Sequence, residues 1–179
     1  MIIKKILSLA ASIISLFILQ FIFLVNSISQ ENNIKSYSRD SGVLSLMYHR
    51  FNENKYPSTN IRMNMFLKHI KLIGDLNYKF INPEQFQKDF DIPKKQKKIL
   101  LTVDDAFKSF YEVAWPYLNK NKIPFILFVS TEPVGNHGYM TWDQIKEINN
   151  ESFAVIGHHS HSHEYLIDKN NQEFVKDIE

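Results

Sequence analysis

The sequence predicts an α/β fold, in which a parallel sheet is covered by helices. Beyond about residue 43, short aliphatic runs alternate with longer amphipathic segments, which is the pattern of parallel strands joined by helices. The chain has 179 residues, of which 44% are hydrophobic and 13% aromatic. A chain of this size and composition can bury one core but not two. We therefore expect a single domain over residues 43–179.

Four runs have the nearly continuous apolar character of strands that are buried on both faces of a sheet. Polar or ionisable residues follow three of them directly. The predicted strands are Val43 to Met47, Ile99 to Val103, Phe125 to Val129 and Phe153 to Ile156.

Helices are predicted between these strands from the spacing of their apolar residues. Pro116 should kink one helix or end its regular part. Thr141 and Gln144 have the spacing of a capping box, which opens a helix. The predicted helices run from Met63 to Leu76, over a short segment after Pro83 that includes Phe86 and Phe90, from Phe107 to Asn119, and from Thr141 through Ile148.

The N-terminal segment reads as a targeting signal. Lys4 and Lys5 precede an apolar run from Ile6 to Val25 that is nearly long enough to cross a bilayer as a helix. Residues 1–29 are therefore expected to be a signal peptide or a membrane anchor, and the sequence leaves both open. Residues 30–42 are expected to be a polar linker. In either case the rest of the chain would be exported to the periplasmic or extracellular face of the cytoplasmic membrane.

Charge and cysteine content limit the function classes. The formal net charge of +2 and the pI near 8.6 are too mild for a nucleic-acid-binding protein, so no nucleic-acid partner is expected. The chain has no cysteine, which excludes disulfides and thiolate zinc sites. Any metal must therefore be held by nitrogen and oxygen. Oligomeric state cannot be read from the sequence.

Ionisable residues follow three of the predicted strands, at the sheet edge where α/β folds build their sites. They are His49, the pair Asp104-Asp105, and the cluster that contains His159 and His163. A carboxylate and two imidazoles suit zinc or a similar divalent ion, and a second carboxylate beside the metal can accept a proton. A helical turn would place both imidazoles on one face, and Gly157 is expected to let the chain turn sharply before them. The pattern favours a metal-dependent hydrolase.

Simpler explanations exist for each of these groups. The aspartates could begin a helix, and the histidines could belong to an exposed polar loop. His49 could be a buried histidine, or one that lines the pocket without binding a metal. Three predicted strands end at the same edge of the sheet, which favours a role in a functional site for the two aspartates and for His159 and His163. For His49, the simpler explanations are at least as good.

The motifs resemble those of the polysaccharide deacetylases of the carbohydrate esterase 4, or NodB-homology, type. The family's Thr-Phe-Asp-Asp-Gly motif is similar to residues 102–106, with Ala106 in place of the glycine, and its His-Ser/Thr-x-x-His motif is similar to residues 159–163. The segment 46–50, and the segment 125–129 followed by 139–142, are similar to the subgroup that modifies exported N-acetylglucosamine polymers. The resemblance extends from about Val43 to Leu166.

This resemblance implies roles for individual residues. Asp104 would be the catalytic base, while Asp105, His159 and His163 would hold a divalent metal, zinc or else cobalt, nickel, iron or manganese. His49 would face the substrate, an N-acetylated polysaccharide. The fold would be about half of the family's distorted β/α barrel, preceded by an N-terminal hydrophobic helix. The barrel would be incomplete at its C-terminus, because the family's later motifs are not found.

Three functions are compatible with these motifs. The first is hydrolysis of N-acetyl groups, that is, of amide bonds, on a cell-envelope or exported polysaccharide. The second is a catalytically degenerate or truncated module that binds metal or glycan without turnover. The third is O-acetyl esterase activity of the xylan type, because an ester's leaving alcohol needs less help than an amine.

Overall fold

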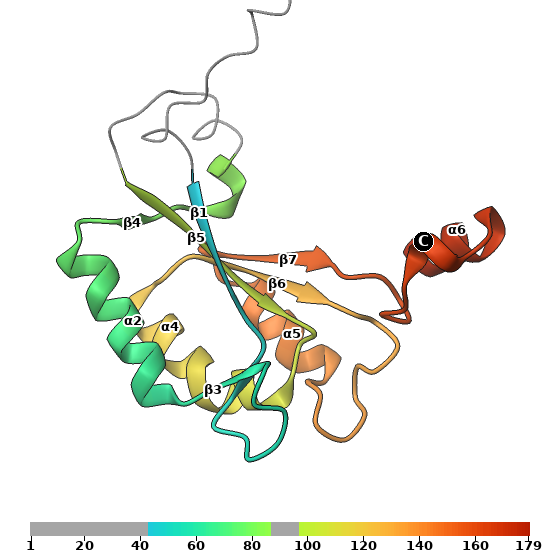
Figure 1. The fold of residues 1–179 in the computed structure, drawn as a ribbon, viewed down its shortest axis with the longest axis horizontal. Coiled ribbons are helices and arrows are strands. Elements are labelled where there is room, and N and C mark those ends of the chain that lie inside the picture. The colour runs from blue at the N-terminus through green and yellow to red at the C-terminus, as the bar shows by residue number, and fades with distance from the viewer. Residues whose placement is uncertain (1–42, 87–96) are drawn as a thin grey trace, which may run out of the picture. The chain divides into compact units, whose positions relative to one another are not determined.

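A computed structural model describes residues 43–86 and 97–179 of the chain (Figure 1). The predicted signal or anchor over residues 1–29, the linker over residues 30–42 and the position of Phe90 lie outside the described residues. Among the residues that are described, no helix is long and apolar enough to cross a membrane.

A five-stranded parallel sheet forms the centre of the domain and confirms the predicted fold class. The four predicted strands are all present, with ends that differ from the prediction by no more than a residue or two. The main order is β1 (Val43–Tyr48), β5 (Lys98–Asp104), β6 (Phe125–Val129) and β7 (Ala154–His158), and the short β4 (Lys79–Phe80) pairs with the start of β5. Two short strands, β2 (Arg50–Phe51) and β3 (Asn60–Ile61), pair separately after β1.

The helices begin close to where their apolar spacing predicts. The segment after Pro83 begins with a 3₁₀ turn, η1 (Pro83–Gln85), and Phe86 is helical, while the rest of this predicted helix lies outside the described residues. The predicted helix over residues 107–119 is present from Lys108 to Asn121, but it contains a π-helical segment, η2 (Phe110–Ala114), directly before α4 (Trp115–Asn121). Pro116 lies in the first turn of α4, so the helix departs from regular α geometry just before this proline. The other helices are α2 (Met63–Asp75), α5 (Trp142–Asn149), η3 (Leu166–Asp168) and α6 (Asn171–Ile178).

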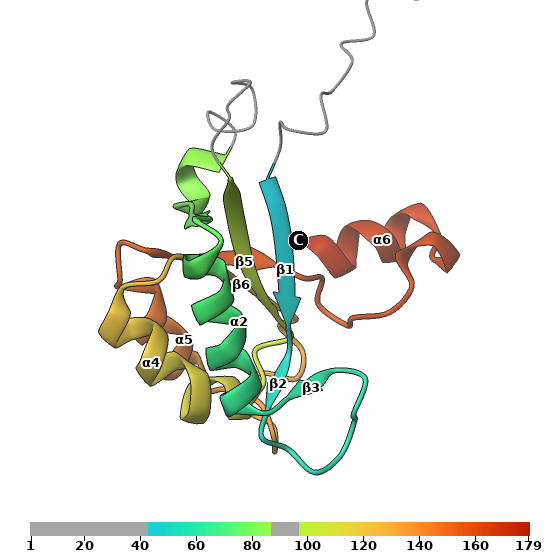
Figure 2. The same ribbon diagram turned by 60° about the vertical axis from the view of Figure 1, so that its left-hand side comes forward.

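The main core lies between the sheet and the helices α2, α4 and α5, which cover one of its faces (Figure 2). Alternate residues of β5 and β6 point into this core, together with Phe66 from α2, Leu118 from α4 and Ile148 from α5. Burial of large aromatic and aliphatic side chains supplies most of the driving force for folding. The sheet is thereby fixed as the rigid support from which the loops at its carboxyl edge extend.

Gly157 has a different role from the predicted one. It lies inside β7 rather than at a sharp turn. A Cβ atom at this position would lie 2.5 Å from Cδ1 and 2.6 Å from Cε1 of Phe128 on the neighbouring strand. Glycine is therefore required because the phenyl ring of Phe128 occupies the space above it.

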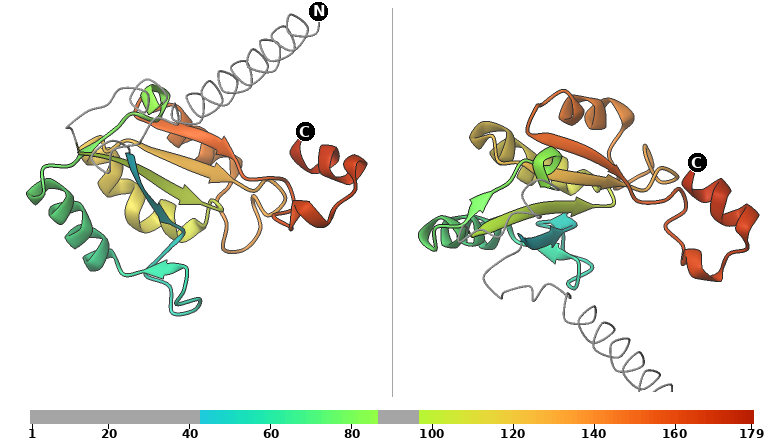
Figure 3. Two further views of the ribbon diagram at one scale, coloured as in Figure 1. Left: turned by 45° about the horizontal axis from the view of Figure 1, so that its top comes forward. Right: turned by 90° about the horizontal axis from the view of Figure 1, so that it is seen from above.

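Helix α6 lies apart from the helices that cover the sheet (Figures 1 and 3). Its apolar residues Phe174, Val175 and Ile178 are exposed to 40%, 44% and 40%. Asp177 is the one residue of α6 that is buried. The sequence pattern did not predict this helix, although Asn170 and Glu173 form a capping box at its start.

Candidate active site

The carboxyl edge of the sheet brings the predicted site residues together. Asp104 ends β5, Asp105 follows it directly, and His49 follows β1. His159 comes immediately after β7, and its N–H donates to the carbonyl of Val129 at the end of β6 (3.0 Å). Parallel strands all end at this edge, so residues distant in sequence become neighbours.

The turn after β5 is held in an unfavourable backbone conformation. Asp105 and Ala106 both have left-handed dihedrals, with φ of 71° and 53°. Each such residue costs roughly 1–2 kcal/mol when it is not glycine. The Ala106 carbonyl accepts a hydrogen bond from the N–H of Met140 (2.9 Å), and the side chain of Ala106 is fully buried. These surroundings keep Asp105 directed toward the histidines.

The segment that carries His159 and His163 is a loop, which corrects the expectation of a helical turn. Ser160 and His163 have φ of 63° and 60°, so the chain reverses within a few residues. The Ser160 hydroxyl accepts from the N–H of His163 (3.0 Å), and the Ser130 hydroxyl donates to the carbonyl of His159 (3.0 Å). The two imidazole rings still meet, with centroids 4.8 Å apart and ring planes at 77°.

The geometry of Asp105, His159 and His163 fits a tetrahedral metal site. Their candidate ligand atoms all lie within 4.8 Å of one another. Nε2 of His163 and Nε2 of His159 lie 3.2 Å and 3.5 Å from Oδ1 of Asp105. Two ligands that are each about 2.05 Å from a tetrahedral zinc ion are about 3.4 Å apart. Among the described residues, Oδ1 of Asp105 is buried and accepts no hydrogen bond, as a carboxylate oxygen directed at a cation would be.

Asp104 lies beside this triad without belonging to it. Its Oδ2 is 3.9 Å from Nε2 of His159 and 4.0 Å from Nε2 of His49. Burial raises the pKa of the Asp104 carboxyl, and the nearby imidazoles, when protonated, partly offset this rise. A carboxylate with a raised pKa is a better proton acceptor than an ordinary one. Asp104 therefore has the position and the environment of a general base.

His49 is brought to the same edge, with 18% of its side chain exposed. Its imidazole contacts Asp104 and is not part of the candidate metal triad. The structure therefore places His49 where it could face a substrate, and its role remains a prediction.

Arg50 anchors a cluster at the rim of the site that the sequence analysis did not identify. Its guanidinium lies 3.3 Å from the ring centroid of Phe107 and 4.4 Å from that of Tyr56, and it pairs with Glu53 (3.3 Å). Glu53 in turn accepts a hydrogen bond from the hydroxyl of Ser109 (2.7 Å). This cluster ties the loop after β1 to the segment that follows Asp105. Its members come from β2, from the loop after β2 and from the segment that follows Asp105, and the Arg-x-x-Glu spacing was the only local signal.

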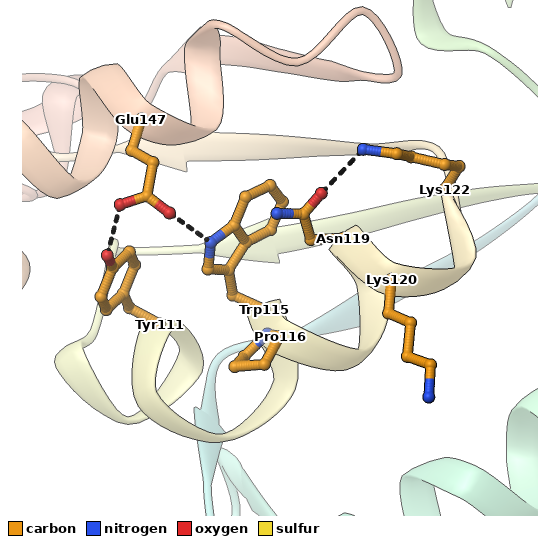
Figure 4. Close-up of a pocket in the computed structure, with 7 residues that line it drawn as sticks. All are labelled: Tyr111, Trp115, Pro116, Asn119, Lys120, Lys122 and Glu147. Carbon is orange, nitrogen blue, oxygen red and sulfur yellow. Dashed lines mark hydrogen bonds between the residues drawn. The ribbon is translucent and has the colours of Figure 1, made fainter.

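Two of the surface pockets among the described residues lie in different parts of the domain. One adjoins the triad, and its lining includes His159 and His163 together with Tyr165, Leu166 and Ile178. The other lies on the helical layer between α4 and α5 (Figure 4). There Glu147 accepts hydrogen bonds from Tyr111 (2.6 Å) and Trp115 (3.3 Å), which join the two helical segments. None of the residues that line this second pocket was predicted to belong to the site.

Comparison with known proteins agrees with this geometry. The profile of the polysaccharide deacetylase family matches residues 91–179, which include the aspartate pair and both histidines. The chain is 26% identical over 115 residues to the Bacillus subtilis protein YxkH, whose name assigns it to the polysaccharide deacetylases; the match covers 63% of this chain and 40% of YxkH. It is 24% identical over 160 residues to a poly-β-1,6-N-acetyl-D-glucosamine N-deacetylase of Staphylococcus aureus, covering 77% of this chain and 54% of that protein.

A solved structure shows the same fold. The structure of IcaB from Ammonifex degensii superposes with a TM-score of 0.62 at 29% identity, over 74% of this chain and 57% of IcaB. An α/β domain with an Asp-His-His triad beside a buried aspartate defines a class of hydrolase sites. The chain carries a domain of the polysaccharide deacetylase family over residues 91–179. It spans about half the length of the curated relatives it matches.

Proposed function

We propose that this protein is a metal-dependent N-deacetylase of a cell-envelope or exported N-acetylglucosamine polymer. The observation that carries the proposal is the triad of Asp105, His159 and His163 with the buried carboxylate of Asp104 next to it. The similarity to a poly-β-1,6-N-acetyl-D-glucosamine N-deacetylase supports the choice of substrate class. The apolar segment at residues 6–25 supports export, either with a cleaved signal or with a retained membrane anchor.

The residues present can divide the chemistry of amide hydrolysis between them. Asp105, His159 and His163 would hold a divalent ion, with zinc the best match to nitrogen and oxygen ligands at this spacing. When bound, such an ion polarises the acetyl carbonyl and makes water more acidic. Asp104 accepts the proton of the attacking water, and its raised pKa suits this role. The proton that Asp104 has taken up would then pass to the departing nitrogen, so that the carbon–nitrogen bond breaks to give acetate and the sugar amine.

Exposure of the site follows a gradient that fits a polymer substrate. The side chains of Asp104 and Asp105 are 10% and 13% exposed, whereas those of His159 and His163 are 34% and 55% exposed. The catalytic carboxylates therefore lie at the base of an open edge that an extended chain of sugars can approach from the side of the histidines.

The test is acetate release from oligomers of β-1,6-linked N-acetylglucosamine by the zinc-loaded full chain and by Asp104→Asn. This substitution removes the proton acceptor and leaves the triad in place, so the rate should fall by a factor of about 100 or more. Asp143→Asn is the matched control, because the Asp143 side chain is 96% exposed and lies outside the site.

Each outcome separates the candidate functions. Acetate release that depends on Asp104 supports the deacetylase. Release from acetylated xylan but not from the amide substrate would replace it with an O-acetyl esterase. Zinc binding without release from either substrate would leave a metal- or glycan-binding module, and the proposal would be wrong.

A further inference from the structure

Helix α6 contacts the rest of the domain through a carboxylate instead of an apolar face. Asp177 is 7% exposed, while every other residue of the helix is exposed. Burial of a charged group is unfavourable unless the group is hydrogen-bonded. The partners of Asp177 therefore explain where this helix lies.

Those partners belong to the loop between the two candidate imidazole ligands. Oδ1 of Asp177 accepts a hydrogen bond from the backbone N–H of Ser162 (3.0 Å), and its backbone carbonyl accepts one from the N–H of His161 (2.8 Å). The hydrogen bond from Ser162 lowers the pKa of the Asp177 carboxyl below its ordinary value, which keeps it ionised at neutral pH.

The contacted residues lie between the two candidate ligands. His159 and His163 lie at the two ends of a loop whose residues Ser160 and His163 are in left-handed conformations. Such conformations are unfavourable and persist only when neighbouring contacts hold them. Asp177 holds the middle of this loop, and the N–H of His159 fixes its start to Val129 (3.0 Å).

We propose that Asp177 is a positioning residue for the metal site, which sets the distance between the His159 and His163 imidazoles through the backbone of Ser162. The inference rests on the proposed metal triad. Groups that orient metal ligands typically change metal affinity by about 10- to 100-fold when they are removed.

The experiment measures zinc affinity of the full chain by competition with a chelator, and the absorption spectrum of the cobalt-substituted protein. Asp177→Ala removes the acceptor and should weaken zinc binding by about 10- to 100-fold. Asp177→Asn keeps an oxygen that can accept the Ser162 N–H, so it should restore most of the affinity. Asp168→Ala, an exposed aspartate shortly before α6, removes the same charge and should bind zinc as the wild type does.

Amide hydrogen exchange provides a local measurement that needs no metal. In the metal-free protein, Asp177→Ala should speed exchange at Ser162, where the side-chain acceptor is lost. Exchange at residues of the central strand β5 should not change. This comparison separates a loosened loop from a domain that has unfolded.

The results also distinguish this inference from the proposed function. Suppose that the wild type binds one equivalent of zinc, which His159→Ala/His163→Ala loses and Asp177→Ala binds with unchanged affinity. That result would overturn the role of Asp177 and leave the proposed function standing. No zinc binding by the folded wild type would overturn both. If Asp168→Ala weakened zinc binding as much as Asp177→Ala does, the effect would come from the loss of a negative charge alone. This result would also overturn the positioning role.

Discussion

At the scale of single residues, Phe128 and Gly157 show how closely the site's supporting strands are packed. Phe128 lies above Gly157, and its ring centroid is 6.2 Å from that of His159. Any side chain at residue 157 would push this ring, and the ring lies beside a candidate metal ligand. The glycine therefore affects both the stability of the sheet and the geometry of the site.

Gly157→Ala should destabilise the domain by about 1–3 kcal/mol, because the new methyl group overlaps the Phe128 ring. Gly74→Ala is the matched control, since a Cβ on this helical glycine of α2 meets nothing within 4 Å. It should stabilise the protein by about 0.5–1 kcal/mol through helix propensity. Urea unfolding of both variants measures the difference. If both variants changed the free energy of unfolding equally, the contact with Phe128 would not contribute to the stability of the domain.

Two residues of the candidate triad, Asp105 and His159, could be predicted because each follows a strand directly, and His163 because it lies four residues after His159. The same edge receives Asp105 from β5 and His159 from β7, so two local observations suffice. Asp177 and Arg50 could not be predicted in this way. Asp177 contacts the loop of His159 and His163 from a helix that lies apart from the sheet, and Arg50 of β2 is held by aromatic rings from two other segments.

At the scale of elements, the capping box of α5 shows which local signals are dependable. The hydroxyl of Thr141 accepts from the N–H of Gln144 (3.3 Å), and the Gln144 side chain accepts from the N–H of Thr141 (2.9 Å). Both bonds involve residues three apart, so their formation depends little on the rest of the fold. Helix α5 was accordingly predicted almost to the residue.

Thr141→Ala should cost about 1 kcal/mol in the free energy of unfolding, because one N–H at the start of α5 loses its acceptor. Thr141→Ser keeps the hydroxyl and should lose much less. Thermal unfolding of the two variants is the measurement. An alanine variant as stable as the serine variant would mean that water satisfies this N–H equally well.

Elements without such local signals were missed or misjudged. The π-helical segment Phe110–Ala114 precedes Pro116, and apolar spacing alone does not distinguish it from a regular helix. The strands β2, β3 and β4 have two residues each, too few for an alternating pattern. Helix α6 does carry a signal, since Phe174, Val175 and Ile178 have helical spacing after the capping box of Asn170, but the segment is short and the prediction did not include it.

At the scale of the whole molecule, metal binding should couple to stability. A ligand that binds only the folded state stabilises it, by about 2.7 kcal/mol at 100 times the dissociation constant. The triad joins β5 to the loop after β7, so binding would connect distant parts of the sheet. Zinc should therefore raise the melting temperature of the wild type and have no such effect on His159→Ala/His163→Ala. Asp104→Asn should retain the increase, since Asp104 is not in the triad. An equal increase in the double variant would place the bound zinc elsewhere.

All the strands that the structure describes pair in parallel, and this affects the order of folding. Parallel neighbours must be brought together across long connections, so a sheet of this kind depends on contacts between residues distant in sequence and forms slowly. Asp105 can meet His159 and His163 only after β5, β6 and β7 have paired in register. The site is therefore assembled at the end of folding, and the rate of zinc uptake by a refolding chain should report the last step of that process, not the first.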